Sequence, residues 1–206
     1  MSAPASTRPL TPADLRFMDA ALALAYARLG ATAPNPAVGC VIVKQGRVIA
    51  AAATAPGGRP HAETQALALA GAAARGASVY VTLEPCAHHG RTPPCAEALV
   101  QARPGEVLIG CADPFAQVDG KGSAILRAAG VRVIEPVRED RAQALNAGFF
   151  KTVRRGQALA VDDDRSGLVD SDFEMKPGET AAQALARAAG QGLTRVRLTP
   201  PGETQR

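Results

Sequence analysis

Apolar residues recur along the chain in two patterns, short unbroken runs and longer segments with a three-to-four-residue period. The runs are rich in Val, Ile and Leu and have the length of buried strands, whereas the periodic segments have the spacing of helices that bury one face. The runs predict strands at 38–43, 48–53, 78–83, 106–110 and 131–134. The periodic segments predict helices at 14–29, 61–75, 95–102, 123–129 and 138–153.

Strands and helices alternate, which predicts an α/β fold whose sheet is covered by helices on both faces. Gln45-Gly46 is expected to join the first two strands in a hairpin. Thr11 is expected to cap the first helix, with Pro12 in its first turn. The expected apolar stripe of that helix is Leu15, Met18, Leu22, Ala25, Tyr26 and Leu29. The expected apolar positions of the second helix include Leu67, Leu69 and Ala70.

Length and composition indicate one globular domain with an appendage. The chain has 206 residues, of which 47% are hydrophobic and 20% charged, and these values do not suggest disorder. We expect an N-terminal extension at 1–13, a main domain at 14–155 and an appendage at 156–206. The appendage carries an alanine-rich helix near 180–189 and an alternating segment at 193–198. It is too short for the several βαβ units of a nucleotide-binding domain and has no glycine-rich phosphate-binding fingerprint.

Segments that address a protein to a membrane are not expected. The first twelve residues are polar and proline-rich and lack the apolar core of a signal peptide. The longest apolar stretch, 20–29, is too short to span a membrane and contains Arg28. Cys40 and Cys111 lie in apolar runs, where a free cysteine is usually a small buried hydrophobe. This use of cysteine fits a reducing, cytoplasmic location.

The charge distribution bears on the kind of ligand. Residues 1–156 carry 17 Lys and Arg against 11 Asp and Glu, and 157–206 carry 6 against 8, so that the first part has a net charge of +6 and the second of −2. A mildly basic domain suits an anionic small-molecule substrate. Aromatic residues make up 3% of the chain and Trp is absent, which argues against a nucleic-acid platform that stacks bases.

Four residues in two short motifs have the spacing of a metal-dependent active site. His61 and Glu63 stand two apart at an expected helix start, and Cys86 and Cys95 follow. Zinc takes about four tetrahedral ligands, and a catalytic site leaves one of them to water. One histidine and two cysteines would leave that position open, and Glu63 would carry protons to and from a water made nucleophilic by zinc. His-x-Glu followed by Pro-Cys and a second cysteine is the pattern of zinc-dependent deaminases.

Two structural alternatives stay open for these residues. A closed zinc site that only stabilises the fold needs a fourth protein ligand, for which the chain offers His88 or His89. A disulfide between Cys86 and Cys95 is the other alternative, and it leaves the His-x-Glu motif without a role.

The segment between the two cysteines is the most distinctive part of the sequence. Eight residues, AHHGRTPP, separate Cys86 from Cys95, where simpler zinc deaminases have two. Arg91 and Thr92 are suited to phosphate oxygens, and a solvated loop is the alternative. Asn35 stands between two prolines ahead of the first strand, where it is either a turn residue or a substrate-binding amide.

These motifs resemble the deaminase half of the bifunctional riboflavin-biosynthesis enzymes, the diaminohydroxyphosphoribosylaminopyrimidine deaminases. The likeness covers roughly 14–155 and rests on TLEPCAHHGRTPPC at 82–95, PNP at 34–36, VGCVIV at 38–43, HAE at 61–63 and AGFFK at 147–151. It implies a cytidine-deaminase-like fold, in which a five-stranded mixed sheet lies between helices in a three-layer sandwich. It also implies hydrolytic removal of ammonia from the 2-amino group of a pyrimidinone that bears a ribosylamine phosphate.

The resemblance assigns roles by motif position. It implies that His61, Cys86 and Cys95 bind one zinc ion per chain and that Glu63 shuttles protons. The residues that it implies for substrate binding are Asn35, Ala87, His88, Arg91 and Thr92. Such enzymes normally continue as an NADPH-dependent reductase, so we expect no NADPH site here and a reductase step on a separate chain. A homodimer is also expected.

Three departures from the family pattern bear on the substrate. Thr54 stands seven residues before His61, where the family usually has a histidine, and Phe115 follows Asp-Pro where the family tends to have Asn. The appendage at 156–206 stands in place of the reductase and is a relic of it, a packing element or an oligomer contact. Two alternatives therefore stay open: a deaminase of another nucleobase or nucleotide, and a zinc-bound scaffold without turnover.

Overall fold

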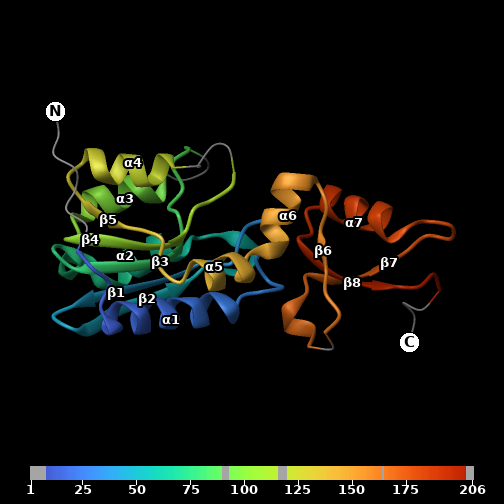
Figure 1. Ribbon diagram of the computed structural model, residues 1–206, viewed down its shortest axis with the longest axis horizontal. Coiled ribbons are helices and arrows are strands. Elements are labelled where there is room, and N and C mark those ends of the chain that lie inside the picture. The colour runs from blue at the N-terminus through green and yellow to red at the C-terminus, as the bar shows by residue number, and fades with distance from the viewer. Residues whose placement is uncertain (1–7, 90–92, 116–119, 164, 203–206) are drawn as a thin grey trace.

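A computed structural model of the protein describes residues 8–89, 93–115, 120–163 and 165–202. Within these residues the chain forms a larger unit and, beside it, a smaller one from Leu159 onward (Figure 1). The larger unit contains β1 (Gly39–Lys44), β2 (Arg47–Ala53), β3 (Ser78–Leu83), β4 (Glu106–Cys111) and β5 (Arg132–Ile134), in the order β2-β1-β3-β4-β5. β1 runs antiparallel to β2 and β3, whereas β3, β4 and β5 are parallel. The expected five-stranded mixed sheet is confirmed.

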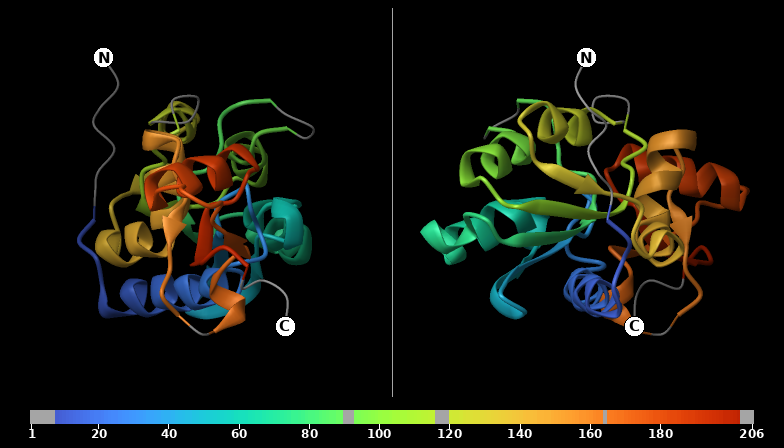
Figure 2. Two further views of the ribbon diagram at one scale, coloured as in Figure 1. Left: turned by 90° about the vertical axis from the view of Figure 1, so that its right-hand side faces the viewer. Right: turned by 60° about the vertical axis from the view of Figure 1, so that its left-hand side comes forward.

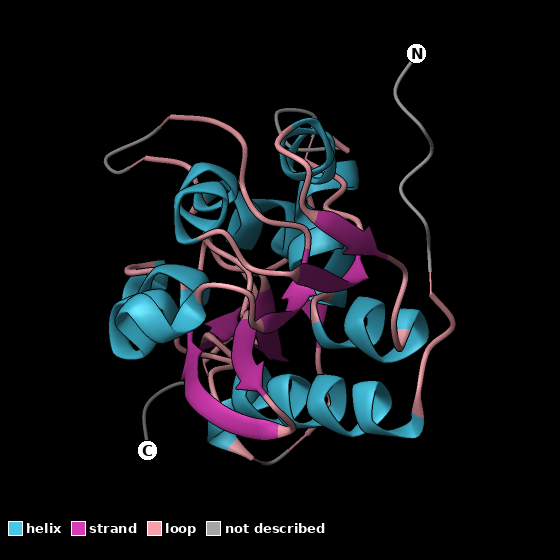
Figure 3. Ribbon diagram, turned by 90° about the vertical axis from the view of Figure 1, so that its left-hand side faces the viewer, coloured by secondary structure: helices cyan, strands magenta, loops and turns pink. Residues whose placement is uncertain are grey.

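Helices cover both faces of this sheet (Figures 2 and 3). On one face lie α1 (Pro12–Tyr26) and α5 (Glu139–Leu145). On the other lie α2 (Ala62–Ala70), α3 (Cys95–Ala102) and α4 (Lys121–Ala128), with short 3-10 turns at Pro56–Gly58 and Gly71–Ala74. The unit is therefore a three-layer α/β/α sandwich, as expected. No helix of the described part is long and apolar enough to cross a membrane.

The central strands are the core of this unit. β4 is buried from end to end, and β3 is buried except at its first residue. Each fully buried Val, Leu or Ile side chain contributes about 1.5–3 kcal/mol relative to an exposed one. Cys40 and Cys111 are buried among these residues, as predicted. Gln45 and Gly46 both have positive φ, at 52° and 74°, which is the backbone of the predicted tight hairpin turn.

Two helices end earlier than their periodicity predicts. α1 has the predicted Thr11 cap but stops at Tyr26, whose side chain is 45% exposed rather than part of the apolar stripe. Leu29 is nevertheless buried, in the turn that follows the helix. α2 stops before Gly71, whose φ of +53° a helix cannot continue through. Leu69, one of the expected apolar positions, lies in the last turn and is 68% exposed.

The single helix predicted at 138–153 is two helices, α5 and α6 (Ala147–Arg155), that meet at Asn146. The buried Asn146 side chain accepts a hydrogen bond from the backbone N–H of Ala37 and donates one to its carbonyl, both at 3.0 Å. The apolar periodicity continues across Asn146, but its backbone leaves the helical region to make this pair of bonds. The contact ties the loop before β1 to the start of α6.

The smaller unit is a three-stranded parallel sheet with one helix. It contains β6 (Leu159–Ala160), β7 (Ser171–Glu174), α7 (Ala181–Gly190) and β8 (Arg195–Thr199), with a 3-10 turn at Ser166–Leu168 and the strand order β6-β8-β7. A small core of its own joins α7 to one face of the sheet. The predicted helix and alternating segment correspond to α7 and β8. β6 and β7 are not predicted, because they are short and mostly polar or exposed.

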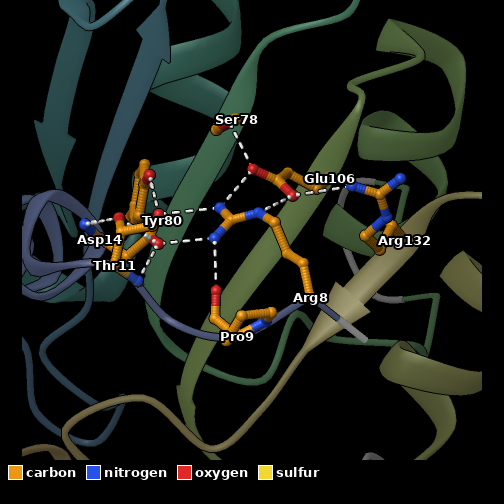
Figure 4. Close-up of polar contacts among 8 residues, drawn as sticks. All are labelled: Arg8, Pro9, Thr11, Asp14, Ser78, Tyr80, Glu106 and Arg132. Atoms are coloured by element: carbon orange, nitrogen blue, oxygen red, sulfur yellow. Dashed lines mark hydrogen bonds and ion pairs between the residues drawn. The ribbon is translucent and has the colours of Figure 1, made fainter. Parts of the chain in front are cut away.

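Arg8 binds two buried carboxylates of the larger unit (Figure 4). Its guanidinium donates to both oxygens of Asp14, at 2.7 and 2.9 Å, and to both oxygens of Glu106, at 3.0 and 2.7 Å. Tyr80 also donates to Asp14 at 2.7 Å, and Ser78 to Glu106 at 2.8 Å. The end of the predicted N-terminal extension thus joins α1 to the start of β4. Hydrogen bonds from Arg8 are the main reason why the pKa values of Asp14 and Glu106 lie below their usual range.

Replacing Arg8 by Met is expected to lower the free energy of unfolding at pH 7 by about 3 kcal/mol, because buried Asp14 loses its counter-ion and buried Glu106 keeps only Arg132, at 3.5 Å. A carboxylate whose pKa is lowered in the folded protein stabilises the fold at pH values above its pKa in the unfolded chain, about 4. That stabilisation is lost as the pH falls through the lower pKa of the folded state. The difference between R8M and wild type should therefore shrink below pH 4. Urea unfolding at pH 7 and pH 3 checks this, with the exposed Arg16→Met as control. Equal losses in R8M and R16M would contradict it.

Candidate metal centre and substrate pocket

Three segments meet at the carboxyl end of β3. His61 occupies the N-cap position of α2, directly after Pro60. Cys86 follows β3 by three residues, and Cys95 is the first residue of α3. The carboxyl ends of parallel strands are where α/β sheets usually place their sites. The fold thereby brings together the three residues that the motif spacing predicted as metal ligands.

The geometry of these side chains fits a zinc ion. Nδ1 of His61 lies 3.3 Å from Sγ of Cys95 and 3.6 Å from Sγ of Cys86. The three ligand atoms all lie within 4.8 Å of one another. Zinc bonds of about 2.3 Å to sulfur and 2.1 Å to nitrogen, at a tetrahedral angle, separate the two ligand atoms by about 3.6 Å. One imidazole and two thiols are also a donor set that zinc prefers.

The two structural alternatives find no support in this geometry. Among the described residues, neither His88 nor His89 joins the group of potential ligands. Cys86 and Cys95 are free thiols. Among the described residues the cluster offers three ligands, which is the number of protein ligands in a typical catalytic zinc site.

Hydrogen bonds shift the pKa values of the three clustered side chains in different directions. Cys86 accepts from the Cys95 thiol, from the Cys95 backbone N–H at 3.2 Å and from His61, and these bonds lower the pKa of Cys86 to about 4. The bond to Cys86 is also the main reason why the pKa values of Cys95 and His61 are raised. Cys86 is thus arranged as a thiolate, the form that binds metal.

Glu63 lies beside the cluster in the first turn of α2. Its side chain is buried, and the loss of solvent raises its pKa. A carboxyl group in such surroundings holds a proton at a higher pH than a free glutamate does. Glu63 therefore has the environment of an acid–base group rather than that of a surface carboxylate.

A pocket of about 320 Å³ opens beside His61, Glu63 and Cys86. This volume is within the range usual for small-molecule sites. Further polar side chains in its wall come from Asn35, Thr54, Arg59, Glu84, His88 and Asp113. Its apolar wall is formed by Pro34, Pro36, Val38, Leu83, Phe115, Phe149 and Val153.

Asn35 and His88, two of the predicted substrate contacts, line this pocket. The Asn35 side chain has one long hydrogen bond, from Nδ2 to the carbonyl of Gly57 at 3.5 Å. The His88 ring meets the Phe115 ring edge-on, with centroids 6.0 Å apart. Nδ1 of His88 is buried and has no hydrogen-bond partner within the described parts of the chain. Both residues can therefore offer hydrogen bonds to a ligand.

The described part of the structure does not place the other three predicted substrate contacts in the pocket wall. Ala87 is half-buried and does not line the pocket. Arg91 and Thr92 lie outside the described residues. Thr54 lines the pocket, but its hydroxyl accepts a hydrogen bond from the backbone N–H of Val38 at 3.0 Å and lies 3.4 Å from the Val38 carbonyl.

Sequence reasoning misses several residues of the pocket wall. The buried carboxylate of Glu84 accepts hydrogen bonds from the backbone N–H groups of Asp113, Gly120 and Ser123, at 3.4, 3.0 and 3.1 Å. It thereby holds the loop after β4 and the start of α4 against the pocket. The position of Glu84 directly before the Pro-Cys motif was the available signal. Phe149 reaches the pocket from α6, and its place in the AGFFK segment at 147–151 was the available signal, since apolar periodicity alone does not distinguish it from a core residue.

Comparison with known proteins identifies this arrangement. Residues 12–111 match the family model of the cytidine and deoxycytidylate deaminase zinc-binding region. The riboflavin biosynthesis protein RibD of Haemophilus influenzae is 48% identical over 143 residues, which are 69% of this chain and 38% of that protein. RibD of Escherichia coli is 47% identical over 143 residues, or 69% and 39% of the two chains. The N-terminal domain belongs to this deaminase family.

Solved structures support the same assignment for the deaminase domain. Form 2 of Acinetobacter baumannii RibD has a TM-score of 0.69 at 45% identity and covers 79% of this chain and 43% of that one. Form 1 has a TM-score of 0.78 at 26% identity and covers 91% of this chain and 80% of that one. The deaminase domain thus has the cytidine-deaminase-like fold that its motifs imply. The chain spans 38% and 39% of the two curated relatives named above.

Proposed function

We propose that this chain is a zinc-dependent hydrolase that converts 2,5-diamino-6-(5-phosphoribosylamino)pyrimidin-4-one to the corresponding uracil derivative and ammonia, a step of riboflavin biosynthesis. The observation that carries the proposal is the cluster of His61, Cys86 and Cys95 within 4.8 Å, with buried Glu63 in the wall of the same pocket. The 48% identity to a RibD protein supports the substrate class. The proposed catalytic domain is 14–155, and free thiols suit a cytoplasmic enzyme.

The geometry supports the following roles. His61, Cys86 and Cys95 would hold zinc, which as a Lewis acid makes water nucleophilic near neutral pH. Glu63 takes a proton from the attacking water and returns it to the departing amine, so that water and the C–NH₂ group become a carbonyl and ammonia. The raised pKa of Glu63 suits both transfers, because it brings the carboxyl group closer to the operating pH.

Substrate recognition is assigned to the groups around the pocket. The Asn35 amide and the His88 ring offer hydrogen bonds to the heterocycle, and their places in the pocket wall support this role. Ala87 is proposed to contribute through its backbone, since its side chain has no polar atom. Arg91 and Thr92 are proposed to bind the phosphate, as their chemistry suggests. Three further expectations stay predictions: that the chain has no NADPH site, that the reductase step belongs to a separate chain, and that the protein is a homodimer. Light scattering checks the homodimer.

One observation favours a second candidate, a deaminase of another aminated base or nucleotide. Thr54 and Phe115 both line the pocket, and the Thr54 hydroxyl is occupied by the Val38 backbone. A histidine contact of the RibD type is therefore absent at this position of the described pocket. Deoxycytidylate is a suitable competitor substrate, because it also pairs an aminated pyrimidine with a phosphate.

A substrate panel with zinc-loaded protein separates the two candidates. We expect kcat/KM for the diaminopyrimidinone to exceed that for deoxycytidylate by at least about a hundredfold, since unpaired polar groups in a pocket penalise the wrong substrate. Thr54→His tests the open contact, and we expect it to improve KM for the diaminopyrimidinone without changing zinc content. The reverse order of substrates would favour the second candidate.

A further inference from the structure

Helix α6 has one face in the deaminase pocket and the other against the C-terminal unit. Phe149 and Val153 line the pocket. Gly148 is buried and lies against the segment that leads into β8. A Cβ atom on Gly148 would lie 2.5 Å from the carbonyl oxygen of Thr194 and 2.6 Å from Cγ of Arg195. The two units therefore pack together at Gly148, next to Phe149, with no room for a side chain between them.

The C-terminal unit also touches the loop that carries Asn35. A Cβ atom on Gly192 would lie 3.6 Å from Cβ of Pro34. At the other end of the loop, the backbone of Gly30 lies against the carbonyl of Val169. Leu168 is buried in the core of the larger unit and not in the core of its own unit. The loop at 30–37 is thus supported on both flanks by 167–169 and 192–195.

Asp170 connects these two supporting segments. Oδ2 of Asp170 accepts hydrogen bonds from the backbone N–H of Thr194 at 2.6 Å, from its hydroxyl at 2.9 Å and from the backbone N–H of Arg195 at 2.9 Å. Nε of Arg195 donates to the carbonyl of Leu168 at 2.8 Å. The supporting surface is therefore fixed as one piece.

The part of the junction next to the substrate pocket is closely packed. The cavity where Asp170, Thr194 and Arg195 face Asn35 and Phe149 has a volume of about 10 Å³. Close-packed interiors transmit displacements, because neighbouring side chains have little room to adjust. A shift of the C-terminal unit would consequently move residues of the pocket wall.

We propose that the C-terminal unit is a positioning element of the deaminase pocket, which holds α6 and the 30–37 loop so that Phe149 and Asn35 face the substrate. The proposal rests on the proposed function for the identity of the substrate. It assigns no chemistry to the unit itself. The residues that the unit positions bind the substrate and do not transfer protons. A change in the unit should therefore alter KM more than kcat, which depends on the proton transfers of Glu63.

Gly148→Ala in the zinc-loaded full chain tests this proposal, with Gly190→Ala as the matched control. A Cβ atom on Gly190, at the exposed end of α7, meets nothing within 4 Å. We expect G148A to raise KM about tenfold with kcat within about twofold of wild type and with unchanged zinc content. Amide hydrogen exchange at 30–38 and 147–155 should become faster in G148A. We expect G190A to match wild type in all of these measurements.

Unchanged KM and unchanged exchange in a folded G148A would overturn the proposal, as would a loss confined to kcat. If G148A does not fold, Asp170→Asn and Asp172→Asn form a second pair, because the Asp172 carboxylate binds Arg197, within the C-terminal unit. D170N should then show the raised KM and the faster exchange, and D172N neither. If wild type lacks deaminase activity, the proposed function fails, and the exchange measurement still tests the positioning role by itself.

Discussion

Replacing Glu63 by Gln is expected to abolish deamination while zinc stays bound. Gln has the size and shape of Glu but cannot accept and return a proton, and acid–base catalysis of this kind contributes about 10²–10⁴-fold to rate. The fold should tolerate the change, because burial already raises the pKa of Glu63 and disfavours its charged form. Steady-state kinetics and metal analysis on the same preparation check both parts of the expectation.

Glu97→Gln is the matched control for this experiment. Glu97 lies two residues after Cys95 on α3, carries a half-exposed carboxylate near His89 and does not line the pocket. We expect E97Q to keep both wild-type rate and wild-type zinc content. A kcat for E63Q within tenfold of wild type would contradict the acid–base role of Glu63, and loss of zinc from E63Q would assign it to the metal site.

Replacing Cys95 by Ser is expected to remove both the zinc and the activity. A hydroxyl is a poor zinc ligand at neutral pH, and the remaining two ligands are too few for a stable site. The wild-type chain should contain about one zinc, and the variant a small fraction of that. The melting temperature should also fall, because an ion that binds only the folded state stabilises it. Inductively coupled plasma analysis and thermal unfolding with and without chelator provide the measurements.

Cys111→Ala is the control for the cysteine variants. Cys111 is buried at the end of β4, and its thiol lies 3.8 Å from the carbonyl of Thr82, outside the ligand cluster. C111A should keep its zinc and lose only the stability that a small core truncation costs. Full zinc occupancy in C95S, or zinc loss in C111A as large as in C95S, would refute the ligand assignment.

The parts of the fold that the sequence predicts are those whose cause is local. β3 and α3 lie at the predicted residues, because an apolar run with two Val residues and an amphipathic segment carry their own signals. The break at Asn146 depends on two hydrogen bonds to Ala37, which is 109 residues away. Likewise, nothing in the local sequence distinguishes Arg8 from other polar residues, because its partner Glu106 lies 98 residues later in the chain. No local pattern contains either contact.

The same distinction holds for the site. The metal-ligand cluster is predictable because zinc chemistry restricts both the residue types and their spacing. The substrate pocket is predictable only in part. Asn35 and His88 belong to recognisable motifs and line it as predicted, whereas Asp113 reaches it from another element and is of a type common in turns. The packing of the C-terminal unit against Gly148 is also invisible in the sequence, since a glycine in a helix does not reveal which segment will approach it.

Ammonia release from the diaminopyrimidinone ribosylamine phosphate, measured for zinc-loaded wild type and E63Q side by side, tests the central claim most directly. We expect steady release from wild type that depends on zinc, with the uracil derivative identified by mass, and none above background from E63Q. Folded, zinc-containing wild-type protein that releases no ammonia from this substrate would contradict the claim. Equal release from the two proteins would contradict the mechanism.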